Sequence, residues 1–143
     1  MLVSELMTRD VRVVAPSDTL ERAATMMGQV DAGAIPVGEN DRLVGMITDR
    51  DIAVRAVARG KPPQTPVRDV MSTEVKYCFE DDDIEDVARN MADIQVRRLP
   101  VLNRDKRLVG IVSLGDLAVE HAVQASTALS GISEPGGRHS QTG

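Results

Sequence analysis

Two short segments of the chain carry the same pair of polar residues, and these residues are the best candidates for chemistry. Thr48 is followed three positions later by Asp51, and Ser113 is followed three positions later by Asp116. A hydroxyl residue with a carboxylate three positions on is typical of a helix N-terminus, where each side chain hydrogen-bonds a backbone amide of the first turn. A capping box is therefore the simplest interpretation of either copy alone.

The same pair of residues also suits a ligand that carries a phosphate and a ribose. Backbone amides and the dipole at a helix N-terminus attract phosphate, and a hydroxyl side chain adds a donor. A carboxylate one turn along the helix can accept charge-assisted hydrogen bonds from both ribose hydroxyls. Capping and nucleotide binding both remain open at this point.

The two pairs recur because the whole sequence is an internal duplication. The corresponding segments are residues 3–8 and 67–72, residues 35–37 and 99–101, and, after one inserted residue, residues 43–48 and 108–113. Two half-size units usually bury their apolar faces against each other, so we expect the repeats to form one folding unit. A site present in one repeat should then have a counterpart in the other.

Each repeat predicts the order strand, helix, strand, strand, helix. Apolar residues at helical spacing predict the first helix of each repeat; they are Leu20, Ala23, Ala24 and Met27, and Ile84, Val87, Ala88 and Met91. Asp18 and Asp82 are the expected helix starts. The expected strands are residues 11–14, 34–37, 43–47, 99–102 and 108–112, with polar hairpin turns at 40–41 and 103–105, and the expected second helices are 49–59 and 115–125.

These elements predict the domain organisation. We expect a first repeat over residues 1–60, a linker over 61–66, a second repeat over 67–125 and a disordered C-terminal tail over 126–143. Residues 52–58 and 117–125 are apolar round most of a helix. A helix of that kind is buried on two sides, and we expect the second side to contact another copy of the chain in a homodimer.

Composition excludes several other functions. The net charge is −5, which disfavours the many phosphate contacts of nonspecific nucleic-acid binding. Charged residues within the first ten positions argue against a signal peptide, and no apolar run is long enough for a membrane span. The single cysteine, Cys78, cannot form an internal disulfide, and His121 and His139 lack metal-ligand spacing. We expect a cytoplasmic protein with no metal site.

The duplicated segments, in this order, resemble the CBS domain, named after cystathionine β-synthase, in its usual tandem pair. The resemblance is carried by the Met-Thr and Met-Ser starts at 7–8 and 71–72, by the Pro-Val strands and by the two hydroxyl–carboxylate segments, and it spans residues 1–122. It implies an α/β fold of two tandem β-α-β-β-α repeats packed with pseudo-two-fold symmetry, which senses adenosine-containing ligands in two clefts between the repeats. Segments after Met7 and Met71 would contribute to the cleft of the opposite repeat.

The resemblance also implies the residues that would bind the nucleotide, the strand residues through their backbone. They are Ala34, Ile35, Pro36, Thr48 and Asp51 in the first cleft, and Arg97, Arg98, Leu99, Pro100, Ser113 and Asp116 in the second; Arg50 is a further candidate in the first cleft, from its position beside Asp51. The expected ligand is AMP, ADP, ATP, NAD or S-adenosylmethionine, and no catalytic cofactor is expected. A regulated protein partner is a further expectation.

The two clefts are not expected to be equivalent. Arg97 and Arg98 occupy positions from which the family often reaches phosphate, whereas the first repeat has Gly33 and Ala34 there. The second cleft should therefore hold charged nucleotides more tightly, unless the two arginines are only a solvated surface pair. Arg50 and Arg55 either replace them in part in the first cleft or belong to a solvated helix face.

Two other function classes are alternatives to the sensor. One is a structural or interaction module whose clefts are empty, with the Thr and Asp residues acting only as caps. The other is an enzyme, which we disfavour because no nucleophile–base pair and no metal-ligand set is visible in the sequence. Cys78 lies in a strand pattern beside Tyr77 and Phe79, which predicts a buried or edge thiol rather than a nucleophile.

Overall fold

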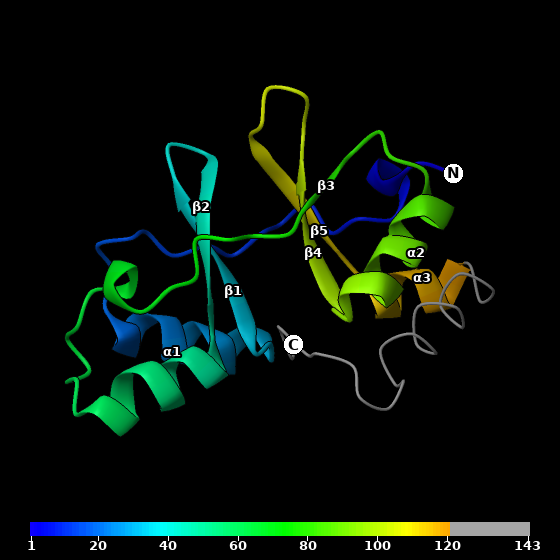
Figure 1. Cartoon of the computed structure of the whole chain (residues 1–143). Coiled ribbons are helices and arrows are strands. Elements are labelled where there is room, and N and C mark those ends of the chain that lie inside the picture. Colours follow the sequence, from blue (N-terminus) through cyan, green and yellow to red (C-terminus); the bar gives the residue numbers. More distant parts are fainter. Residues whose placement is uncertain (121–143) are drawn as a thin grey trace. The chain divides into compact units, whose positions relative to one another are not determined.

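The structure, a computed structural model, describes residues 1–120 as two compact units (Figure 1). The first-repeat unit is Arg12–Val75, and the second-repeat unit joins Met1–Val11 to the described residues that begin at Lys76. Residues 1–11 begin the expected first repeat, over 1–60, yet they belong to the second-repeat unit. The expected tail over 126–143, the end of the last expected helix over 121–125, and both histidines lie outside the described residues.

The first-repeat unit is a helix, a hairpin and a second helix. Its elements are α1 (Leu20–Val30), β1 (Ala34–Glu39), β2 (Arg42–Thr48), the π-helix η2 (Asp51–Ala56), and the 3₁₀ turns η3 (Val57–Arg59) and η4 (Val67–Asp69). β1 and β2 are antiparallel, and Ala34 lies opposite Thr48. The expected polar turn is confirmed, because Asn40 and Asp41 both have positive φ, 54° and 64°, which these residue types tolerate.

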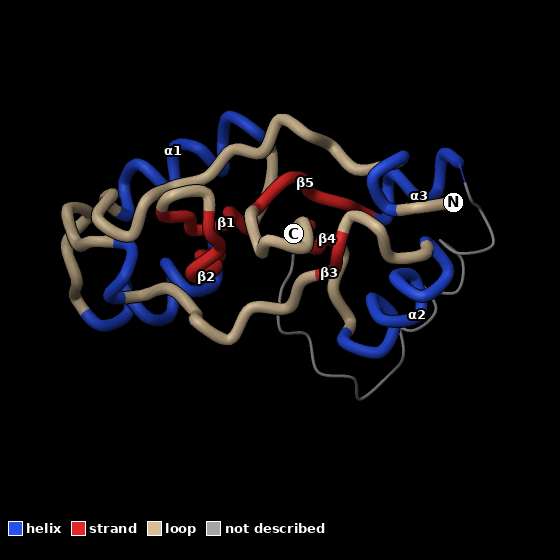
Figure 2. The backbone as a smooth tube through the Cα atoms, turned by 90° about the horizontal axis from the view of Figure 1, so that it is seen from above, coloured by secondary structure: helices blue, strands red, loops and turns tan. Residues whose placement is uncertain are grey.

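The second-repeat unit repeats this plan with one more strand. Its elements are the 3₁₀ turn η1 (Val3–Glu5), β3 (Cys78–Phe79), α2 (Ile84–Ile94), β4 (Arg98–Leu102), β5 (Leu108–Ser113) and α3 (Leu114–Glu120). β3 pairs in parallel with β4, and β4 pairs antiparallel with β5, so that Arg98 lies opposite Ser113. The tube in Figure 2 shows this sheet with α2 and α3 beside it, and both helices share one core with its strands.

The expected first helix of each repeat is confirmed. All four predicted apolar residues of α2 are buried; in α1, Ala24 is exposed and Met26 is buried in its place. The helix starts were predicted one residue early. Thr19 and Asp83 are the caps that accept amide hydrogen bonds of the first turn, whereas Asp18 and Asp82 accept from amides of the preceding turn.

The expected strand over residues 11–14 is wrong, because only Val14 forms a bridge, to Val37. Its amide donates to the Pro36 carbonyl at 3.1 Å, and the Gly38 amide donates to the Val14 carbonyl at 2.9 Å. Proline has no amide hydrogen, so Pro36 blocks extension on one side and Pro16 blocks it on the other. In the second repeat Glu80 stands in place of Pro16, and its amide donates to Leu102.

A glycine in each hairpin admits a segment from outside its own repeat. Gly45 in β2 lies against the chain at Met71 and Ser72, and a Cβ on Gly45 would be 2.8 Å from the Ser72 carbonyl oxygen. The next residue, Met46, exchanges two backbone hydrogen bonds of 2.9 Å with Ser72. The close approach of two backbones therefore requires glycine at this position.

Gly110 in β5 plays the same part in the second-repeat unit. A Cβ there would be 2.6 Å from the Met7 sulfur and 3.0 Å from the Thr8 carbonyl oxygen. Ile111 and Thr8 exchange backbone hydrogen bonds of 2.9 and 2.8 Å. Each hairpin thus holds the Met-Thr or Met-Ser segment that begins the other repeat.

Within residues 1–120, no helix is long and apolar enough to cross a membrane.

We predict that Gly45→Ala and Gly110→Ala each lower the free energy of unfolding by about 1–3 kcal/mol, because the added methyl group displaces a packed segment. Gly28→Ala is the matched control, since Gly28 lies inside α1 and nothing lies within 4 Å of its Cβ position. Alanine there should stabilise the protein by up to about 1 kcal/mol. Urea unfolding measures all three, and equal effects at the three positions would contradict this account of the segments.

Candidate functional site

Thr48 and Asp51 form a complete capping box at the end of β2. The Asp51 amide donates to the Thr48 hydroxyl oxygen at 3.0 Å, and the Thr48 amide donates to Asp51 Oδ2 at 3.1 Å. Thr48 is 6% exposed, so the box lies at the edge of the core. The strand therefore ends in a helix N-terminus whose first amides are already partly satisfied by side chains.

Ser113 and Asp116 form the same box at the end of β5. The Ser113 amide donates to Asp116 Oδ2 at 3.0 Å, and the Asp116 amide donates to the Ser113 hydroxyl oxygen at 3.3 Å. Both side chains are half-buried. Both pairs therefore make the reciprocal hydrogen bonds of a capping box, as the capping interpretation predicts.

The boxes leave hydrogen-bonding capacity for a ligand. The Thr48 hydroxyl accepts one bond and still has its own hydrogen to donate, and a carboxylate has about four acceptor positions. In the first box Asp51 Oδ1 lies 3.8 Å from the guanidinium of Arg55, an ion pair along the helix. Asp116 has no such partner among the described residues, and the sequence places an acid, Glu120, four positions on.

The strand residues of the predicted site lie beside the boxes, and their side chains are buried. Ile35 and Leu99 are 2% and 0% exposed and belong to the two cores, and Pro36 and Pro100 are also buried. They can therefore offer a ligand only backbone atoms. Ala34, opposite Thr48, is buried as well.

The cations of the predicted site are available for an anion. Arg98 lies opposite Ser113 in the sheet and is half-buried, and Arg97 is exposed. The Arg97 carbonyl accepts the Leu114 amide at 3.0 Å, which ties the start of β4 to the start of α3. Arg50 is exposed, and its amide donates to Asp49 Oδ1 at 2.8 Å. Among residues 1–120 none of these three guanidinium groups forms an ion pair.

The glycines of the duplicated segments are the residues whose part in the fold the sequence analysis missed. Gly45 and Gly110 lie three residues before Thr48 and Ser113, and they hold the Met-Ser and Met-Thr segments against the same strands. The signal was present, because both glycines recur at equivalent positions of the two repeats. Their recurrence does not by itself identify the segments that pack against them, 71–72 at Gly45 and 7–8 at Gly110.

Among the described residues, Cys78 is not an activated nucleophile, and no side-chain cluster forms a metal-binding site. Cys78 is 4% exposed in the second-repeat core, and burial, with a smaller contribution from Asp82, raises the pKa of its thiol from 9.0 to about 12. The expected buried thiol is confirmed. No group of three or more His, Cys, Asp or Glu side chains could hold a metal ion within the part of the chain that the structure describes.

A protein-family model, the CBS domain, matches the chain twice, over residues 3–57 and 67–121. The chain therefore belongs to the CBS domain family, as a tandem pair. It is 47% identical over 133 residues to the CBS domain-containing protein YhcV of Bacillus subtilis, covering 92% of this chain and 94% of that protein.

Two solved structures share the fold. The crystal structure of Hypoxic Response Protein I with two coordinated zinc ions has a TM-score of 0.76 and 36% identity, covering 84% of this chain and 98% of that one. The CBS domain protein PAE2072 from Pyrobaculum aerophilum, complexed with AMP, has a TM-score of 0.75 and 25% identity, covering 90% of this chain and 99% of that one. The expected fold class, α/β with two CBS repeats, is confirmed.

The buried thiol gives a pH prediction. Because the folded pKa of Cys78 lies above the unfolded value of 9.0, folding favours the neutral thiol, and this contribution is complete below pH 9 and is lost as pH rises toward 12. Above pH 9 the wild type should lose up to about 1.4 kcal/mol of stability per pH unit more than Cys78→Ala. Urea unfolding at several alkaline pH values measures the difference between the two proteins. Parallel curves would contradict the assignment.

Proposed function

We propose that the chain is a regulatory module that binds an adenosine-containing nucleotide at each of its two hydroxyl–carboxylate boxes. The observation that carries the proposal is the duplicated box itself, with Arg98 placed directly across the sheet from Ser113. The AMP complex of PAE2072 supports the ligand class. AMP, ADP, ATP, NAD and S-adenosylmethionine all belong to that class.

Each part of the box has a role toward such a ligand. The hydroxyl of Thr48 or Ser113 donates to a phosphate oxygen, as do the amides that begin the following helix. The free lone pairs of Asp51 or Asp116 accept from the ribose hydroxyls, a charge-assisted contact of two oxygens. Backbone atoms at Ala34 and its neighbours line the rest of the site.

The module would act by binding alone, as a regulator of a partner protein in the cytoplasm, and without catalysis of its own. A ligand that binds the folded chain changes the stability of the elements it joins, here a strand end and a helix start. That change is what a partner protein could sense. The name of the relative YhcV, a CBS domain-containing protein, fits a module of this kind.

A structural or interaction module with empty sites is the second candidate. It is favoured by one observation, which is that both boxes are complete without a ligand. Removing a cap costs about 1 kcal/mol of stability and nothing else. The two candidates therefore differ in what a ligand does to the protein and to its variants.

We predict that an adenine nucleotide at about 100 times its dissociation constant stabilises the wild type by about 2.7 kcal/mol. Asp51→Asn and Asp116→Asn each keep one acceptor and lose the charge-assisted contact, so the affinity at the altered site should fall about tenfold or more. Thermal unfolding of the wild type, both single variants and the double variant, with each nucleotide in turn, measures these effects.

The control for these variants is Asp69→Asn, an exposed carboxylate of the first-repeat unit outside both boxes. Its nucleotide response should equal that of the wild type. Stabilisation that disappears only in the double variant indicates that both boxes bind. The absence of stabilisation by every adenosine compound would favour the empty module.

The second box should hold charged nucleotides more tightly than the first. Arg98 is free of ion pairs among the described residues, whereas the cation nearest to Asp51, Arg55, is already paired with it. Arg98→Ala should therefore weaken AMP about tenfold at one of two sites in calorimetry. Arg89→Ala, on α2 of the same unit, is the control, and unchanged binding in Arg98→Ala would contradict the asymmetry.

We further propose a homodimer through the helix that follows β2. Ala56 is 1% exposed inside the first-repeat core, while Val54 and Val57 on the other side are 46% and 69% exposed and would be covered by the second copy. Val57→Glu should shift sedimentation toward the monomer, because it places a charge in an apolar contact. Val13→Glu, an exposed valine elsewhere in the unit, should not. A wild type that sediments as a monomer would contradict the dimer.

A further inference from the structure

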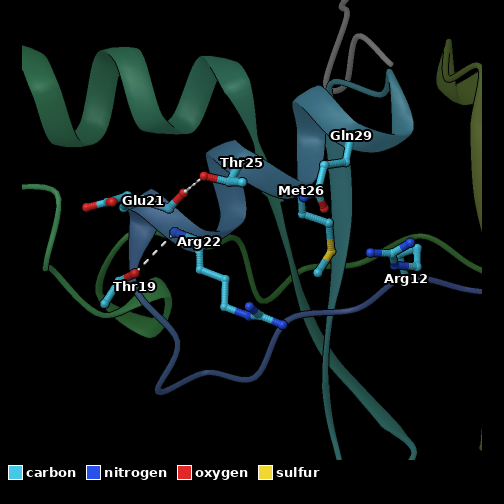
Figure 3. A pocket seen from close by; sticks show the side chains of 7 residues that line it. All are labelled: Arg12, Thr19, Glu21, Arg22, Thr25, Met26 and Gln29. Atoms are coloured by element: carbon cyan, nitrogen blue, oxygen red, sulfur yellow. Dashed lines mark hydrogen bonds between the residues drawn. The ribbon is translucent and has the colours of Figure 1, made fainter.

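A polar hollow of about 420 Å³ lies on α1 in the first-repeat unit, away from the hydroxyl–carboxylate box (Figure 3). Residues of α1 and its cap supply most of the lining, and Arg12 comes from the segment that enters the unit. Thr48 and Asp51 are not among the residues that line it. Its volume lies within the range of small-molecule sites, about 300–1,000 Å³.

Two guanidinium groups face this hollow. Arg12 is exposed, and its side chain makes no ion pair within residues 1–120. Arg22 has one charged partner there, Asp18, and the two are 3.8 Å apart at an exposed position. A contact of that length at the surface contributes little, so most of the donors of Arg22 remain available.

The other side chains fix the character of the hollow between the arginines. Figure 3 shows the guanidinium groups of Arg12 and Arg22 on either side of the Met26 thioether, with the Gln29 amide above it. Met26 is only 5% exposed and gives the hollow an apolar floor. Gln29 is exposed at the rim, where its amide can donate.

The remaining lining groups are either occupied or distant. The Thr25 hydroxyl donates to the Glu21 carbonyl at 2.8 Å, and the Thr19 hydroxyl oxygen accepts the Arg22 amide at 3.1 Å, both within α1 and its cap. The Glu21 carboxylate points away from the two guanidinium groups, toward the opposite end of the hollow (Figure 3). Among the lining residues, those between the arginines therefore supply positive charge and donors but no carboxylate, and Asp18 beside Arg22 does not line the hollow.

We propose that this hollow binds the phosphoryl group of a small phosphorylated molecule between Arg12 and Arg22. Two guanidinium groups that face one space repel each other and attract an anion, and each presents several N–H donors in a planar fork that fits phosphate oxygens. The Gln29 amide supplies a further donor. The rest of the molecule would extend along α1 toward Glu21, whose carboxylate can accept from a hydroxyl group.

The site is independent of the proposed nucleotide sites, and its test keeps the two apart. Inorganic phosphate and glycerol phosphate are titrated into the full chain, with glycerol as the uncharged probe and salt added to a constant ionic strength. Amide signals of Thr25, Met26 and Gln29 in proton–nitrogen correlation spectra report on this hollow alone. We expect saturable shifts with both phosphate probes, with dissociation constants on the order of 1–10 mM for so small a ligand, and none with glycerol.

Arg12→Gln and Arg22→Gln should each raise both dissociation constants about tenfold, because each removes a charge-assisted contact. Arg42→Gln, which removes an exposed arginine of the same unit outside the hollow, should leave them unchanged. The Asp51→Asn, Asp116→Asn double variant should also bind phosphate with the same dissociation constant as the wild type, whether or not it binds a nucleotide. Melting temperatures of the arginine variants check that the fold is retained.

Two results would overturn the proposal. One is that the α1 signals do not move with either phosphate probe at about 50 mM, a concentration that would half-saturate even a very weak site. The other is that they move equally in the wild type and in Arg12→Gln. A response to glycerol phosphate without one to inorganic phosphate would mean that the glycerol part, and not the phosphoryl group, is recognised. That result would also contradict the proposal.

Discussion

The contact on which the fold most depends is the close approach of two backbones at Gly45 and at Gly110. At each glycine a strand of one hairpin exchanges two hydrogen bonds with a segment that begins the other repeat. Any side chain there would collide with a carbonyl oxygen or with the thioether of Met71 or Met7. The thioethers of Met7, which is buried, and Met71, which is half-buried, pack against the same contact, and the strands run on from it to the hydroxyl–carboxylate boxes.

The boxes show how one local motif can serve stability and recognition together. Capping uses one carboxylate oxygen and the lone pair of one hydroxyl. The hydroxyl hydrogen remains for a partner outside the fold, and so does the other carboxylate oxygen, which in the first box also lies 3.8 Å from the guanidinium of Arg55. The cap also fixes the rotamers of both side chains, so a ligand would meet them already oriented and would lose less entropy in binding. Arg55, paired with the carboxylate of one box, and Arg98, opposite the hydroxyl residue of the other, then place the cation differently in two sites of one geometry.

The sequence predicted what depends on local periodicity. The helices α1 and α2, both hairpins and both boxes follow from apolar spacing and from residue types within a few positions of each other. The prediction of a strand over 11–14 was wrong because the pairing of that segment is limited by Pro36, which is distant in the sequence, as well as by Pro16 nearby. The hollow between Arg12 and Arg22 could not be predicted, since it joins a helix face to a segment that packs beside it only in the folded unit.

The chain path makes the first-repeat unit an insertion within the second-repeat unit, which resumes at Lys76 after leaving at Val11. While the insert is folded, it holds its two ends at a fixed separation, so the two parts of the second-repeat unit are joined by a fixed connection. Unfolding the insert turns that connection into a long flexible loop, and closing such a loop costs roughly 3–4 kcal/mol of chain entropy. The two units are thereby coupled through the covalent chain itself, and a ligand that stabilises the insert also raises the stability of the unit that surrounds it in the sequence.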